Sequence, residues 1–234
     1  MSNVQEFVPS LEKMIKAGVH VGHDASKWHP KMKEYLFTTK QNTHLINLEI
    51  TEQKFREALE YIYDSVASGK KILFVSTKKQ ATATVKKTAE NTEMPYMIRR
   101  WVGGVFTNYE VIQKRIRQIT TLEDKLAKGT LVGFTKKERK VFGDKIAKGN
   151  KLFQGLKDLK SKPVAIFVED VVRDELAIKE ARAAGVKVIG LVDSNVNPEL
   201  VDFPIPANDD ALASIELIYG AVESTILAAK KAQK

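Results

Sequence analysis

Lys71-Ile-Leu-Phe-Val-Ser76 is the stretch that decides the fold, because its four successive apolar residues leave no polar face for solvent. Such a run predicts a strand that is covered on both faces, as in a parallel sheet. The same pattern returns at Val164-Ala-Ile-Phe-Val168, and Val186-Lys-Val-Ile-Gly-Leu-Val192 reads as a third strand. We therefore expect these runs to belong to one mostly parallel sheet.

Helical patterns separate these strands. From Thr51 to about Ala67 the apolar residues recur every three or four positions, which predicts a helix with one buried face. Further helices are expected over 80–92 and 174–184, and a long final helix is expected after Asn208, with Asp209 and Asp210 in its first turn. Smaller elements are expected as a helix over 10–17 and as short strands at 35–37, 45–48, 96–98 and 203–205. Strands that alternate with helices predict an α/β fold.

The middle of the chain breaks this alternation. Thr107-Asn-Tyr-Glu110 and Thr135-Lys-Lys-Glu138 both match the capping box that opens a helix. Apolar residues then follow at heptad-like spacing in each segment, although Gly143 and Gly149 interrupt the second one. We expect two helices joined by residues 129–134, forming an antiparallel helical hairpin inserted into the α/β domain.

Charge is distributed unevenly along the chain. The net charge of the 234 residues is +9, yet residues 99–162 hold seventeen Lys/Arg against six Asp/Glu, whereas residues 163–234 hold seven against twelve. A positive segment of this kind is the electrostatic footprint of a protein that binds a polyanion such as nucleic acid. The basic residues of the expected hairpin include Lys114, Arg115, Arg117, Lys136, Lys137, Arg139, Lys140, Lys145 and Lys148.

Two short clusters combine cations with an aromatic ring. Lys27-Trp28-His29-Pro30-Lys31, followed by Lys33, supplies phosphate-pairing side chains beside a ring that can stack on a base. Trp28 is equally well interpreted as a core anchor that braces the loop. Arg99-Arg100-Trp101-Val-Gly-Gly104 is the second cluster, and its glycines allow a close backbone approach or a turn into the hairpin. There we favour RNA binding over a simple hinge.

Enzyme and metal sites receive less support. His20 and His23 could hold a divalent ion together with Asp24, Asp193 or Asp209, but their glycine-rich loop does not place both rings on one face. Glu169, Asp170 and Asp193 follow expected strands, where doubly wound sheets bind ligands, and could form a magnesium or phospho-acceptor site. Carboxylates that accept loop hydrogen bonds are the simpler interpretation. No phosphate-binding glycine motif follows a strand, so we expect no enzyme, no metal and no cofactor.

Composition narrows the class of protein further. Hydrophobic residues make up 43% of the chain, which supports a real core, and cysteine is absent, which excludes disulfides and cysteine-based zinc or redox sites. No run of about 18 apolar residues is present to span a membrane. Residues 1–9 lack the pattern of a signal or transit peptide, so we expect a cytoplasmic protein.

Motifs along almost the whole chain resemble those of the universal small-subunit ribosomal protein S2 family in its bacterial form. They are Lys16-Ala-Gly-Val-His-Val-Gly-His23, Trp28-x-Pro30-Lys-Met32, His44-x-Ile-Asn-Leu48, Ile72-Leu-Phe-Val75 with Thr77-Lys78, Arg100-Trp-x-Gly-Gly104 with Thr107-Asn108, Ala177-Ile-x-Glu-Ala181, Val192-Asp-x-Asn195 and Asn208-Asp-Asp-Ala211. The resemblance implies a three-layer, flavodoxin-like α/β domain over 1–106 and 159–234, with a basic coiled-coil hairpin over 107–158. It also implies a structural role in the small (30S) ribosomal subunit and no catalysis.

The resemblance implies small-subunit ribosomal RNA as the main partner. Neighbouring ribosomal proteins are also implied, including the large multi-OB-fold protein that captures messenger RNA. The residues that we expect to bind RNA are Lys27, Trp28, Lys31, Lys33, Lys78, Arg99, Arg100, Trp101, Lys114, Arg115, Arg117, Lys136, Lys137 and Arg139.

Overall fold

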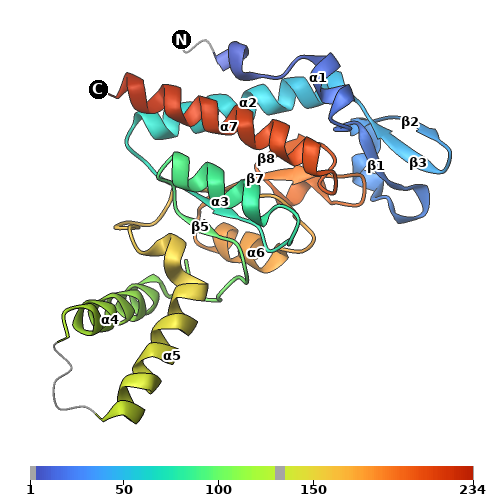
Figure 1. Cartoon of the computed structure of the whole chain (residues 1–234). Helices are drawn as coiled ribbons and strands as arrows, with labels where there is room; N and C mark the ends of the chain where they lie inside the picture. Colours follow the sequence, from blue (N-terminus) through green and yellow to red (C-terminus); the bar gives the residue numbers. More distant parts are fainter. Residues whose placement is uncertain (1–3, 130–134, 234) are drawn as a thin grey trace.

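The computed structural model describes residues 4–129 and 135–233 and contains two sheets (Figure 1). The larger one has five strands in the order β5-β4-β6-β7-β8, and each neighbouring pair is parallel. In chain order this places the second strand outside the first, as in flavodoxin-like folds. The strands are β4 (Ile72–Val75), β5 (Tyr96–Met97), β6 (Ala165–Val168), β7 (Lys187–Val192) and β8 (Phe203–Pro206).

Helices cover both faces of this sheet because its strands are apolar on both sides. Phe74, Phe167 and their neighbours pack against α2 (Leu48–Ala67), α3 (Thr82–Asn91) and α7 (Leu212–Ala232). Leu73 and Ile166 point to the opposite face and pack with α6 (Glu175–Ala183) and α4 (Tyr109–Ala127). The α/β fold with a mostly parallel sheet, expected from the sequence, is confirmed.

The smaller sheet lies near the N-terminus, after α1 (Leu11–Lys16). It is antiparallel, in the order β1-β3-β2, with β1 (Val21–Asp24), β2 (Leu36–Lys40) and β3 (Thr43–Ile46). The strand β1 was not expected, because Val-Gly-His-Asp shows no alternation of apolar and polar residues and forms a strand only through its pairing with β3.

The helices α4 and α5 (Lys136–Phe153) project away from the sheets (Figure 1). They are in close contact at Gly149, where an added Cβ would lie 2.4 Å from Ile119 Cδ1. A side chain at that point would require Ile119 to shift, whereas at Gly143 an added Cβ would meet open space. The expected connection over 129–134 lies almost entirely outside the described residues.

Two helix starts differ from the sequence expectation. The capping box at Thr135 forms as expected, but Thr107 does not cap α4, because its amide and hydroxyl donate to Glu180 instead. The final helix begins at Leu212, since Asn208 Oδ1 accepts from the amides of Asp210 and Ala211 in a turn that precedes the helix. Asp209 and Asp210 consequently lie in this turn and not in the helix.

The helix α7 is long and apolar enough, by length and composition alone, to cross a membrane. In the fold it packs along α2 and α3, and its buried residues include Tyr219, Val222 and Ile226. Its apolar character is that of a core helix.

Candidate nucleic-acid interface

The loop that carries Lys27 and Trp28 is fastened to the end of β7 through Ser194. The amide of His23 donates to Ser194 Oγ at 2.8 Å, and the amide of His29 donates to the Ser194 carbonyl oxygen at 2.8 Å. Glycine at position 22 leaves room for Ser194, because a Cβ there would lie only 2.9 Å from Ser194 Oγ. Hydrogen bonds across the fold therefore hold this loop in place.

Within that loop the expected RNA-binding residues have different environments. Lys27 and Lys33 are exposed, whereas the Lys31 ammonium is paired with the Glu199 carboxylate. Trp28 is half-buried, with its ring centroid 5.3 Å from that of His44. The indole therefore braces the loop while part of it stays accessible, and stacking of Trp28 on RNA stays a prediction.

The Arg99-Arg100-Trp101 cluster is divided between surface and core. Arg99 and Arg100 are exposed, but Trp101 is only 6% exposed. Its indole packs against Phe106 at a centroid distance of 5.6 Å, and its Nε1 donates to Glu180 at 2.8 Å. The Trp101 ring is therefore enclosed in the protein, where it packs the junction, and the RNA-binding role expected of Trp101 stays a prediction.

Glu180 organises the junction at which the chain enters α4. Its carboxylate accepts from Trp101 Nε1, from the amides of Phe106 and Thr107, and from the Thr107 hydroxyl, at 2.8 to 3.1 Å. Burial raises the pKa of Glu180, but these hydrogen bonds outweigh it and hold the pKa below its ordinary value. This role of Glu180 was not predicted; its one sequence signal is that Glu180 lies three residues after Ala177, on the buried face of α6.

Lys78 lies among carboxylates at the carboxyl edge of the large sheet. Its ammonium is 2.7 Å from Asp210 Oδ1 and 2.9 Å from Asp209 Oδ1, and it is within 4 Å of Asp170 and Glu169. Burial lowers the pKa of Lys78, but the hydrogen bonds to Asp210 and Asp209 outweigh it and raise the pKa above its ordinary value. Its side chain is 12% exposed and paired with acidic residues, so the RNA-binding role expected of Lys78 stays a prediction.

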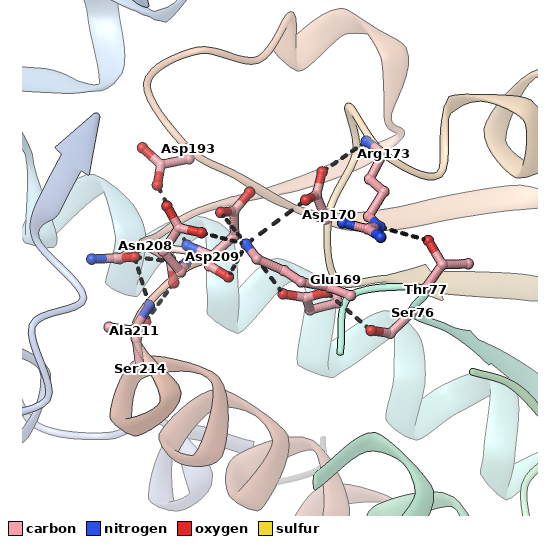
Figure 2. A network of polar contacts seen from close by, with 12 residues as sticks. Ser76, Thr77, Glu169, Asp170, Arg173, Asp193, Asn208, Asp209, Ala211 and Ser214 are labelled. Atoms are coloured by element: carbon pink, nitrogen blue, oxygen red, sulfur yellow. Dashed lines mark hydrogen bonds and ion pairs between the residues drawn. The ribbon is translucent and has the colours of Figure 1, made fainter. Parts of the chain in front are cut away.

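The acidic residues that follow β6, β7 and β8 lie close together around Lys78 (Figure 2). Burial, supported by Asp209 and Asp170, raises the pKa of Glu169 to about 8, although Lys78 and a hydrogen bond from Ser76 oppose the shift. Burial and the nearby Asp193 and Asp170 raise the pKa of Asp209 to about 7. Proton uptake and the Lys78 ammonium together keep these crowded carboxyl groups compatible with one another.

His23 joins the N-terminal loop to the same cluster. Its Nδ1 is 3.1 Å from Asp193 Oδ2, and its Nε2 is 3.3 Å from Asp210 Oδ2. The bond to Asp193 raises the pKa of His23, against the lowering effect of burial. His23, Asp193 and Asp209 each offer one ligand atom within 4.8 Å of the others, so these three residues could hold a divalent ion. His20, the other histidine of the motif, does not belong to this group.

The basic residues expected on the first projecting helix are all exposed, and two of them share one surface. Lys114, Arg115 and Arg117 are exposed on α4. Lys114 and Arg117 line a hollow of about 330 Å³ together with Gln118, Thr121, Leu122 and Lys125. This lining contains three cations and no carboxylate, so it offers positive charge to an anion.

The expected residues on α5 are exposed near its start. Lys136, Lys137 and Arg139 occupy its first turn and the residue after it, beyond the capping threonine. The start of α5, which carries these residues, lies far from the large sheet (Figure 1). Positive surface thus extends along both projecting helices.

Comparison with known proteins identifies the family. The sequence model of the family described as "Ribosomal protein S2" matches residues 14–229. The chain belongs to the ribosomal protein S2 family. It is 39% identical over 225 residues to "Small ribosomal subunit protein uS2" of Dehalococcoides mccartyi, covering 96% of this chain and 92% of that relative. It is 42% identical over 221 residues to the uS2 proteins of Fusobacterium nucleatum and Chlorobium chlorochromatii, covering 94% of this chain and 90% and 88% of them.

Membership of this family decides between the alternatives that the sequence left open. The ribosomal protein S2 family is structural and not enzymatic. The carboxylates around Lys78 are therefore not assigned to catalysis.

Proposed function

We propose that this chain is a structural constituent of the bacterial small ribosomal subunit that binds small-subunit ribosomal RNA and supports translation. Family membership and relatives named as small ribosomal subunit proteins support this function. Its place of action is the cytoplasmic ribosome.

The hollow on α4 is the observation that carries the RNA-binding part. Lys114, Arg117 and Lys125 contribute to its lining, which includes no acidic residue, and Arg115 is exposed on the same helix. Contacts between such cations and phosphates release counterions and supply most of the affinity of a protein for nucleic acid. The exposed Lys27, Lys33, Arg99 and Arg100 extend the same chemistry on the body of the protein.

The projecting helices are proposed to act as an arm. In this division residues 1–106 and 159–234 form a three-layer α/β domain, and residues 107–158 form an antiparallel coiled-coil hairpin that docks along folded RNA. Contacts between early residues of α4 and late residues after α5 support the antiparallel arrangement, since Gln113 Nε2 donates to the Leu159 carbonyl oxygen. Farther along the helices, Asn150 Nδ2 donates to Glu123 Oε1.

Protein neighbours are proposed for the acidic part of the chain. Residues 163–234 hold twelve Asp/Glu against seven Lys/Arg, and this charge disfavours contact with phosphates. Other small-subunit proteins, including the large multi-OB-fold protein that captures messenger RNA, are the protein partners that we propose for the chain as a whole.

A salt titration tests the RNA contacts of α4. We expect the variant Lys114→Ala/Arg115→Ala/Arg117→Ala to bind small-subunit ribosomal RNA less tightly. Its slope of log K against log[salt] should be flatter by about 0.7–0.9 for each phosphate that the variant no longer neutralises. The matched control removes three exposed cations elsewhere, Lys13→Ala/Lys179→Ala/Lys231→Ala. Equal slopes for the two variants would mean that α4 faces protein or solvent.

Sedimentation separates a ribosomal constituent from a free RNA-binding factor of the same fold. We expect the full chain to sediment with small subunits at moderate salt and to leave them as salt rises. A chain that stays at the top of the gradient, while small subunits sediment without it, would rule out the constituent role.

A further inference from the structure

A second groove lined by cations lies between α3 and α5. Its volume is about 280 Å³, and its lining includes Lys86 from α3, Arg99 after β5 and Lys151 from α5. Its other lining residues are polar or apolar, and none is acidic. Three positive groups from separate parts of the sequence therefore converge where the projecting helices meet the α/β body.

The walls of this groove are set by close packing. Gly155, just after α5, lies directly against β5, since a Cβ there would be 2.3 Å from the Tyr96 carbonyl oxygen. This contact holds the end of α5 beside the strand that leads to Arg99. Lys86 has a carboxylate 3.6 Å away, Glu90 on its own helix, but that ion pair is 41% and 52% exposed and competes weakly with a phosphate.

The groove and the hollow on α4 lie on different sides of the helix pair. Ile119 and Glu123 mark the side of α4 that contacts α5. At 100° per residue, Lys114, Arg117 and Thr121 point away from that side. The α3–α5 groove, by contrast, is lined by Ala147 and Lys151 of the other helix, α5.

We propose that the groove between α3 and α5 binds a stretch of RNA sugar–phosphate backbone separate from the one bound by α4, so that the projecting helices lie between two RNA segments. This inference rests on the proposed function. Arg99 can pair with a phosphate through two parallel hydrogen bonds, and Gln154 adds a neutral donor of the kind that contacts phosphates. The small volume favours a backbone that passes along the groove over an acidic peptide whose side chains would need to be enclosed.

Salt titration of matched variants tests this inference. The groove variant is Lys86→Ala/Arg99→Ala/Lys151→Ala, the α4 variant is Lys114→Ala/Arg115→Ala/Arg117→Ala, and the control is Lys13→Ala/Lys179→Ala/Lys231→Ala. We expect the groove variant to flatten the salt slope for small-subunit ribosomal RNA relative to the control, and we expect the two effects to add when the groove and α4 changes are combined. Circular dichroism checks that each variant is folded.

Backbone cleavage of the bound RNA by hydroxyl radicals separates the two RNA segments. The full chain should protect two stretches, of which the groove variant leaves one unprotected and the α4 variant leaves the other unprotected. The inference would be overturned if the groove variant matched the control in salt slope and in RNA protection while the α4 variant lost both slope and protection. The proposed function would then still stand. If neither variant differs from the control, both fail. Loss of the groove variant from small subunits with unchanged RNA binding would assign the groove to a protein and overturn the inference as well.

Discussion

At the scale of single residues, the carboxyl edge of the sheet holds an acid that keeps its proton at neutral pH. Glu169 follows β6, is fully buried and receives a hydrogen bond from Ser76 on one oxygen. Burial raises its pKa to about 8, whereas an unfolded chain would release the proton near its ordinary value of 4.5. The proton is therefore bound more tightly in the folded state.

This difference predicts how stability depends on pH. The contribution of Glu169 is fully present below about pH 4.5 and is lost as the pH rises to about 8, because only the unfolded state releases the proton in that window. Between about pH 4.5 and about pH 8, the free energy of unfolding of the unsubstituted protein should fall relative to that of Glu169→Gln, by up to about 1.4 kcal/mol per pH unit. Urea unfolding of both proteins at several pH values measures the difference, and parallel curves would contradict it.

Glu180 offers a second test at this scale. The variant Glu180→Ala would leave the Trp101 indole, two amides and a hydroxyl without their acceptor, so we expect a loss of about 3 kcal/mol in the free energy of unfolding. Glu180→Gln keeps an acceptor oxygen and should lose less. Glu175→Gln, on the exposed side of the same helix, is the control in the same urea titrations. A loss from Glu180→Ala no larger than that of the control would show that the carboxylate is not needed there.

At the scale of elements, the two glycines of α5 have opposite roles. Gly149→Ala would push Ile119 out of place, which costs about 1–3 kcal/mol and outweighs the gain in helix propensity. Gly143→Ala meets open space and should stabilise by about 0.8–1 kcal/mol. Thermal unfolding of the two variants is the measurement, and stabilisation by both would mean that α4 and α5 are not in close contact.

Elements with a strong local pattern could be predicted, and those that depend on distant partners could not. The strands β4 and β6 are apolar throughout, so their burial followed from composition alone. The box at Thr135 forms because both of its partners are local, whereas the identical pattern at Thr107 is overridden by Glu180, 73 positions away. The candidate site shows the same division. Exposure of Lys114 or Arg117 followed from helical spacing, but the hydrogen bond of Trp101 and the ion pairs of Lys78 involve carboxylates from remote segments.

At the scale of the whole molecule, the two sheets differ in how well they are enclosed. All four residues of β6 are buried, whereas β2 lies at one edge of the small sheet and four of its five residues are exposed. Amide hydrogen exchange should therefore be slowest in β4, β6 and β7 and much faster in β2 of the isolated chain. Mass spectrometry of peptic fragments can compare these segments, and equal protection of β2 and β6 would contradict this picture.

The pairing of β4 with β6 has a consequence for the order in which the chain acquires structure. Ser76 and Glu169, which meet at the ends of these neighbouring strands, are 93 positions apart in the sequence. During synthesis β4 cannot pair with β6 until β6 has been made. The helices α4 and α5 are closer in the sequence and can pair as soon as both exist. Once paired, they bring the start and end of the intervening segment together, which lowers the entropy lost in closing the sheet. We therefore expect the two projecting helices to pair early in folding and to bring β4 and β6 close enough to pair.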